Sequence, residues 1–119
     1  MAKPSLLVVD DDKNTLDGLV RILQCDGYPV SGVLSGYGAL KLLSNNKFDV
    51  IITDMNMPGM DGLTLIQEVR KRKEPVAIVI VTANNFVKAS VDTVKNVAYD
   101  YYLTKPVNVA ELRTVLEKL

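Results

Sequence analysis

The chain has 119 residues, and its 14 lysine and arginine residues balance its 14 aspartate and glutamate residues. A chain of this length forms one domain around a single core. Its apolar content of 48% and charged content of 24% are typical of a globular protein, which excludes wholesale disorder. The formal net charge of zero argues against a broad basic surface for nucleic acid or an anionic membrane.

The sequence has no histidine and a single cysteine, Cys25. These counts exclude a Ser-His or Cys-His nucleophile pair, a histidine-ligated zinc site and an internal disulfide. The longest apolar run, Val76 to Val81, is too short to span a bilayer. Residues 1–5 carry no apolar signal-peptide region. We therefore expect a cytoplasmic protein whose residues 1–119 form one domain.

Short runs rich in β-branched residues alternate along the chain with segments of helical periodicity. Several of these runs are continuously apolar, as in parallel strands that helices cover on both faces. The runs predict strands at Leu6–Val9, Val30–Leu34, Phe48–Thr53, Val76–Thr82 and Tyr101–Leu103.

Five other segments space apolar residues three and four positions apart, which predicts amphipathic helices. Asn108 is the expected N-cap of the last helix. Because parallel strands need crossover connections of this length, the alternation predicts an α/β fold with a doubly wound, five-stranded parallel sheet between two helical layers. The residues that mark the five helices are Leu16, Leu19, Val20 and Leu23; Ala39, Leu42 and Leu43; Leu65, Ile66 and Val69; Val87, Val91, Val94 and Ala98; and Val109, Leu112, Leu116 and Leu119.

Acidic residues follow two of the predicted strands. Asp10 and Asp11 come after the first strand and Asp54 after the third, and ligands of doubly wound sheets bind beyond the carboxyl ends of the strands. Carboxylates about 4 Å apart repel by roughly 4 kcal/mol at an effective dielectric near 20. A fold tolerates this repulsion if a divalent cation lies between the groups or if some of them bind protons. Oxygen ligands without histidine or cysteine favour magnesium or manganese over zinc.

A hydroxyl and an ammonium lie at the same edge of the predicted sheet. Thr82 ends the fourth strand and Lys105 follows the fifth. Both groups are suitable donors to the oxygens of a transferring phosphoryl group. Asp54 stands alone after its strand, so it is the expected nucleophile that would form an aspartyl-phosphate. The small Ala83 leaves space for the phosphoryl group to enter.

Four motifs, in this order and spacing, resemble the signatures of the response-regulator receiver domain of two-component signal transduction. The resemblance covers about Ser5 to Leu119 and implies the flavodoxin-like strand order 2-1-3-4-5 in a three-layer α/β/α domain. The motifs are Leu6-Leu7-Val8-Val9-Asp10-Asp11-Asp12, Asp54-Met55-Asn56-Met57-Pro58-Gly59-Met60-Asp61-Gly62, Val81-Thr82-Ala83 and Leu103-Thr104-Lys105-Pro106.

The resemblance implies that Asp54 is the phosphorylated residue in a magnesium-dependent reaction. Asp11 is then similar to the family's direct metal ligand, and Asp10 assists mainly through water. The backbone carbonyl of Asn56 completes the protein's share of the metal ligands, with Asp54 itself. The resemblance also implies that Asn56 and Asn84 tune the lifetime of the aspartyl-phosphate.

The resemblance also implies a switch. Thr82 is similar to the hydroxyl that moves toward the phosphate, Lys105 to the lysine that pairs with the phosphoryl group, and Tyr102 to the aromatic residue that changes burial on activation. The implied donor is a sensor histidine kinase or a phosphotransfer protein. The usual output surface corresponds to the fourth helix, fifth strand and fifth helix, roughly residues 86–119, and would control an output domain or a downstream protein. Homodimers on phosphorylation are common in the family, and this domain is not expected to contact nucleic acid or membrane.

Two other function classes stay open on the residues alone. An aspartate-nucleophile phosphohydrolase would also use Asp54, but the second Asp that usually serves as its acid/base is replaced by Asn56. A flavin-mononucleotide-binding domain of the same fold needs amides that welcome phosphate after the first strand, where Asp10, Asp11 and Asp12 would repel it. The leading interpretation is a signalling domain that catalyses only its own phosphorylation and dephosphorylation. Considered one at a time, these residues also have purely structural interpretations: Asp12 as the N-cap of a helix and Asp54 as an Asx-turn residue.

Overall fold

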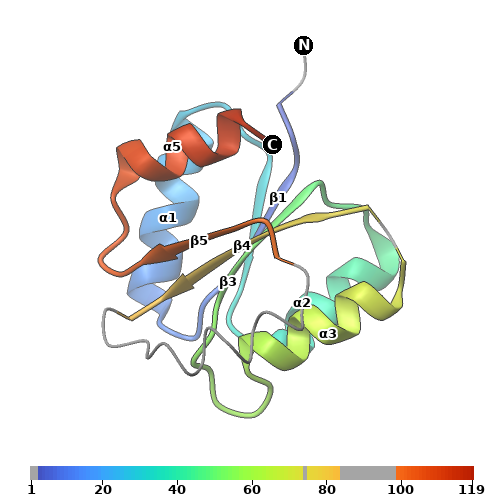
Figure 1. The fold of residues 1–119 in the computed structure, drawn as a ribbon. Helices are drawn as coiled ribbons and strands as arrows, with labels where there is room; N and C mark the ends of the chain where they lie inside the picture. Colours follow the sequence, from blue (N-terminus) through green and yellow to red (C-terminus); the bar gives the residue numbers. More distant parts are fainter. Residues whose placement is uncertain (1–2, 74, 84–98) are drawn as a thin grey trace.

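The computed structural model describes residues 3–73, 75–83 and 99–119. Within these residues, five strands form one parallel sheet in the order β2-β1-β3-β4-β5. This arrangement confirms the predicted doubly wound sheet (Figure 1). The strands are β1 (Leu6–Val9), β2 (Val30–Val33), β3 (Val50–Asp54), β4 (Ala77–Thr82) and β5 (Tyr101–Thr104).

Four helices lie in the described residues and cover both faces of the sheet, with α1 and α5 on one side and α2 and α3 on the other (Figure 1). Each begins at a polar N-cap whose side chain accepts a hydrogen bond from a backbone amide of the first turn. Asn108 caps α5 as predicted, and Asp12 caps α1. The helices are α1 (Lys13–Cys25), α2 (Gly36–Asn45), α3 (Gly62–Lys71) and α5 (Val109–Glu117).

The sheet divides the core into two apolar clusters because successive side chains of a strand point to opposite faces. One cluster joins the sheet to α2 and α3, and it contains Ile51, Ile78 and Leu65. The other joins the sheet to α1 and α5, and it contains Ile52 and Leu112. All of these side chains are at most 1% exposed. Burial of a side chain of this size is worth about 1.5–3 kcal/mol, so both faces hold the sheet in place.

Strand boundaries differ from the predicted ones by one or two residues. The third strand begins at Val50 rather than Phe48, because Asp49 accepts a hydrogen bond from the Ser5 amide and its own amide donates to Ser5, before the regular ladder starts. β2 lies at the edge of the sheet and ends at Val33, and Leu34 beyond it is 49% exposed.

Several predictions fall outside the described residues. These are the fourth helix, which Val87, Val91, Val94 and Ala98 mark, the role of Asn84 and the first part of the expected output surface at residues 86–119. In the part of the chain that the structure describes, no helix has the length and apolar character that crossing a bilayer requires.

Candidate functional site

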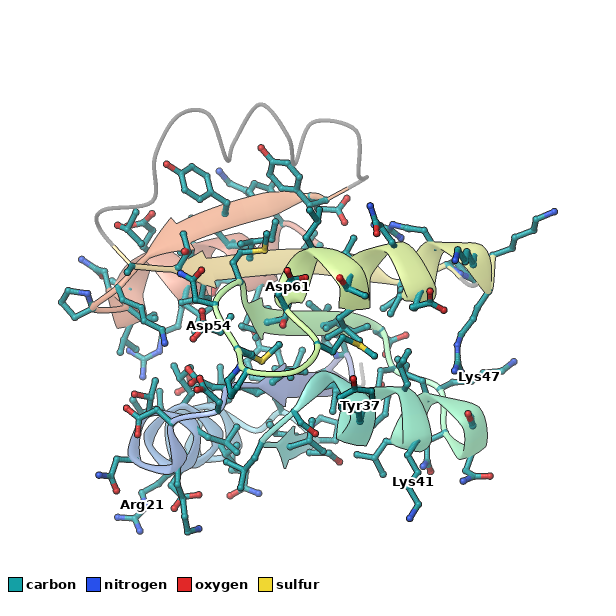
Figure 2. The ribbon with its side chains drawn as sticks, turned by 90° about the horizontal axis from the view of Figure 1, so that it is seen from below. Arg21, Tyr37, Lys41, Lys47, Asp54 and Asp61 are labelled. Carbon is teal, nitrogen blue, oxygen red and sulfur yellow. The ribbon has the colours of Figure 1, made fainter. Side chains whose placement is uncertain are left out.

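Two buried carboxylates and one lysine form the centre of the site at the carboxyl ends of β1 and β3. Asp10 is 2% exposed and Asp54, the last residue of β3, is 6% exposed. Lys105, which follows β5, places its Nζ 3.0 Å from Oδ2 of Asp10 and 2.8 Å from Oδ2 of Asp54. Figure 2 shows Asp54 at the start of the loop that leads to Asp61 and α3. The structure therefore brings together three predicted site residues from three separate segments of the chain.

Backbone amides orient the second oxygen of each buried carboxylate. Oδ1 of Asp10 accepts a hydrogen bond from the amide of Asp12 at 2.9 Å. Oδ1 of Asp54 accepts one from the amide of Asn56 at 3.0 Å. Both are local turns in which a carboxylate bonds the amide two residues later. The Asx-turn that Asp54 favours is thus present, and it directs the remaining oxygen toward Lys105.

A third carboxylate, Asp11, completes an acidic cluster. One oxygen each of Asp10, Asp11 and Asp54 lies within 4.8 Å of the others, and Asp11 is exposed while its two neighbours are buried. The donor set fits magnesium, a hard cation that prefers oxygen ligands and usually keeps several waters. The exposed Asp11 leaves one side of the cluster open for those waters. These three residues could hold a divalent cation.

Lys105 supplies the positive charge that offsets part of this acidic cluster. Its partial burial by itself lowers the pKa of the ammonium, but the hydrogen bonds to Asp54 and Asp10 outweigh that effect. The net result is a pKa raised above its ordinary value of 10.5. Lys105 is therefore charged at neutral pH, and its single positive charge faces the carboxylates of Asp54 and Asp10.

Thr82 is fully buried at the end of β4, and its hydroxyl oxygen has no hydrogen-bond partner among the described residues. Its carbonyl accepts a hydrogen bond from the Lys105 amide at 2.6 Å, which ties the end of β4 to the residue that pairs with both carboxylates. Buried hydroxyls almost always find a partner. An unpartnered one beside this site is a donor that an added group could use.

Tyr102 lies on β5 and is 45% exposed. It pairs in register with Ile80, and Thr104 pairs with Thr82. Since alternate residues of a strand share a face, Tyr102 and Thr82 belong to the same face of the sheet.

Gly62 shapes the site, although in the sequence it stands out only as the last residue of the motif that begins at Asp54. Its amide donates to the Met55 carbonyl at 3.0 Å. A Cβ at position 62 would collide with the backbone carbonyl of Asp54 and would lie 2.8 Å from Cα of Met55. α3 can therefore begin directly against the end of β3 only because this residue has no side chain.

A pocket of about 510 Å³ opens beside the acidic cluster. Ala83 and Lys105 line this pocket. Gly18 of α1 also lines the pocket, and a Cβ there would have nothing within 4 Å. The peptide bond between Lys105 and Pro106, also at this pocket, is cis.

The strand order and the cluster of three carboxylates with a paired lysine define a class of protein: an α/β domain whose acidic site, at the carboxyl edge of the sheet, could hold a metal. The family model for the response regulator receiver domain matches residues 6–117. The chain belongs to this family, and it is a receiver domain of two-component response regulators. The comparisons give no support to the phosphohydrolase or flavin-binding alternatives.

Curated relatives include transcriptional regulators. The regulatory protein TctD of Salmonella typhimurium is 36% identical over 116 residues, which cover 96% of this chain and 50% of TctD. PrrA of Mycobacterium tuberculosis is 35% identical over 112 residues, which cover 94% of this chain and 48% of PrrA. The chain thus spans about half the length of these relatives.

Solved structures share the fold over nearly their full length. The chemotaxis protein CheY4 of Vibrio cholerae superimposes with a TM-score of 0.91 at 29% identity, covering 98% of both chains. The response regulator TrrA of Thermotoga maritima, solved in complex with Mg(2+)-BeF, gives a TM-score of 0.84 at 33% identity, covering 99% of this chain and 98% of TrrA. Both agree with the strand order found here.

Proposed function

We propose that this receiver domain accepts a phosphoryl group on Asp54 in a magnesium-dependent reaction and passes the signal to an output domain or a downstream protein. The observation that carries the proposal is the Asp54 carboxylate itself. It is 6% exposed, its Oδ2 lies 2.8 Å from the Lys105 ammonium, and one of its oxygens lies within 4.8 Å of oxygens of Asp10 and Asp11.

The proposed donor is the phosphohistidine of a sensor histidine kinase or of a phosphotransfer protein. A carboxylate oxygen of Asp54 attacks phosphorus, the bond between phosphorus and the imidazole nitrogen breaks, and the imidazole leaves with that electron pair. The support for Asp54 as the acceptor is that the Asn56 backbone amide orients one of its oxygens and the Lys105 ammonium contacts the other. A bound magnesium ion would neutralise the repulsion among the carboxylates and the incoming phosphoryl group.

Asp10, Asp11 and Asp54, with the backbone carbonyl of Asn56, are the residues that would hold the metal. The support for Asp10, Asp11 and Asp54 is the proximity of their carboxylate oxygens. The support for Asn56 is the hydrogen bond from its backbone amide to Asp54, which places this residue next to the cluster. Manganese, which also prefers oxygen ligands, would serve as a substitute.

The readout proposed here starts from Thr82. Its buried hydroxyl lacks a partner among the described residues and would gain one by donating to the phosphoryl oxygen. Lys105 would pair with another phosphoryl oxygen, since its charge is already directed at Asp54. Tyr102, on the same face of the sheet as Thr82, would change its burial in response. Such a switch needs only two conformations of the domain that are close in free energy. Phosphorylation can then invert their populations with a bias of a few kcal/mol.

The proposal treats residues 1–119 as one domain located in the cytoplasm, where it would meet its kinase. Its chemistry is limited to its own phosphorylation and dephosphorylation, so we do not propose an enzyme acting on a separate substrate. The output surface would include β5 and α5, and a homodimer formed on phosphorylation would use the same surface. The net charge of zero argues against a broad basic surface for nucleic acid on this domain.

Intact-mass spectrometry after incubation with acetyl phosphate, with and without magnesium, tests the proposal. We expect a single phosphoryl adduct that requires magnesium and is absent from Asp54→Asn. Asp61→Asn is the matched control. Asp61 is an exposed acid of the same loop, and asparagine is an equally good N-cap for α3.

The negative outcomes separate two errors. An adduct that persists in Asp54→Asn would place the acceptor elsewhere. The second test adds phosphoramidate, which has the same phosphorus–nitrogen bond as phosphohistidine. If neither acetyl phosphate nor phosphoramidate gives an adduct and calorimetry detects no magnesium binding, the acidic cluster is only structural.

A further inference from the structure

Tyr37 is an aromatic residue with no place in the core. It is the second residue of α2, and it is 62% exposed, more than any other large apolar side chain in the described residues. A ring of this size costs free energy when it faces water. Figure 2 shows Tyr37 on the side of α2 that faces the loop between Asp54 and Asp61.

The ring contacts this loop at its most unusual backbone position. Gly59 has φ +82°, in the left-handed region that favours glycine. A Cβ on Gly59 would lie 3.2 Å from Cε2 of Tyr37, so the ring covers the loop closely at this residue. The contact is made by a ring carbon and not by the hydroxyl.

The neighbouring residues extend the contact. A Cβ on Gly36 would lie 2.8 Å from Sδ of Met60, so the Met60 side chain fills the space above Gly36. Met60 also packs against the apolar cluster under α2 and α3. The first turn of α2 therefore contacts two successive residues of the loop, at Gly59 through Tyr37 and at Met60 through Gly36.

The same loop carries part of the acidic site. It begins at Asp54, and the Asn56 amide holds the Asp54 carboxylate at 3.0 Å. Met55 and Met57 anchor the first half of the loop in the core at 6% and 7% exposure, whereas Pro58 and Gly59 are exposed. In the second half, Gly59 and Met60 contact the first turn of α2, three and four residues after Asn56.

We propose that Tyr37 is a positioning residue for the metal site: its ring braces the loop at Gly59 and so keeps the Asn56 backbone in the orientation that metal binding needs. This inference rests on the function proposed above. Tyr37 does not touch the carboxylates, and it acts through the loop alone.

Calorimetric titration of the full chain with magnesium, combined with hydrogen exchange of the loop amides, tests the inference. We expect Tyr37→Ala to weaken magnesium binding about fivefold, less than the 10- to 100-fold typical of losing a hydrogen-bonded partner of a ligand. Amides of residues 56–61 should exchange faster without added metal. The melting temperature should change by less than about 4 °C, because the side chain is largely exposed.

Three further variants separate bracing from a general loss of structure. Tyr37→Phe keeps the ring and should match the wild type. Tyr37→Gln keeps side-chain length without the ring, should behave like Tyr37→Ala, and provides a second variant if alanine unfolds the chain. Leu34→Ala is the matched control, since Leu34 is another exposed apolar side chain next to α2, at 49% exposure.

The inference is overturned if Tyr37→Ala and Tyr37→Gln keep the wild-type magnesium affinity and loop exchange. It is also overturned if Tyr37→Phe is as weak as alanine, or if Leu34→Ala has the same effect. The wild type is titrated first. If it binds no magnesium, the proposed function fails and the inference fails with it, whereas normal wild-type binding with unaffected variants refutes the inference alone.

Discussion

Replacing Lys105 by alanine should destabilise the metal-free protein by about 2–4 kcal/mol. Removing one partner of a buried ion pair typically costs about 3–5 kcal/mol. The expected loss is somewhat smaller here because 25% of the Lys105 side chain is exposed. Without the ammonium, oxygens of Asp10 and Asp54 at 4.8 Å would repel by about 3.5 kcal/mol at an effective dielectric near 20, which agrees with that range.

Magnesium should reverse most of this loss, since a divalent cation can replace the missing charge among the carboxylates. Urea unfolding at pH 7, first with a chelator and then with excess magnesium, measures both effects. Lys13→Ala is the control, because Lys13 pairs with Asp17 on the exposed face of α1, where such pairs contribute about 0.2–1 kcal/mol. Equal unfolding free energies for wild type and Lys105→Ala without metal would refute the reasoning, and so would equal stabilisation of both proteins by magnesium.

The raised pKa of Lys105 adds a pH dependence to this prediction. Folding favours the charged ammonium, so its contribution is fully present below the ordinary pKa of 10.5 and is lost as the pH rises through the higher pKa of the folded state. The stability difference between wild type and Lys105→Ala should therefore stay constant from neutral pH to about pH 10 and decline above it.

Three further predictions concern other parts of the fold. Gly18→Ala should stabilise the protein by about 0.5–1 kcal/mol in urea unfolding, because a methyl group in this helix interior would meet nothing within 4 Å; a destabilised variant would contradict this. Gly62→Ala should lower the melting temperature by several degrees, as a new Cβ would collide with the Asp54 carbonyl, and an unchanged midpoint would show that α3 can shift freely. The hydrogen bonds from Arg113 hold the pKa of Asp26 below its ordinary 3.8. Any difference in unfolding free energy between wild type and Arg113→Ala should therefore be present at neutral pH and disappear as the pH falls below about 4. A difference that persists in acid would assign the effect to packing.

The fold was largely predictable because its signals are local and mutually consistent. Continuous apolar runs such as Leu6–Val9 are buried at every position and lie centrally in the sheet. The periodic residues Leu16, Leu19 and Leu23 are the buried face of α1. Boundaries were less predictable, since the start of β3 depends on the contact between Asp49 and Ser5, residues 44 positions apart.

The candidate site was predictable in its composition but not in its contacts. The position of Asp10, Asp54 and Lys105 at strand ends follows from the alternation of strands and helices, and the structure places them in contact. The contribution of Gly62 could not be derived, because it depends on how closely α3 approaches β3. The contribution of Tyr37 could not be derived either, because its contact with Gly59 depends on the three-dimensional path of the loop.

The division of the core by the sheet has a consequence for how such a chain can vary in sequence. Side chains that contact α1 and α5 do not share a cluster with those that contact α2 and α3. Substitutions in one layer should therefore combine additively with substitutions in the other, as expected for sites without common neighbours. The helical surface on one side of the sheet can then be altered to suit a new partner while the packing on the other side stays as it is.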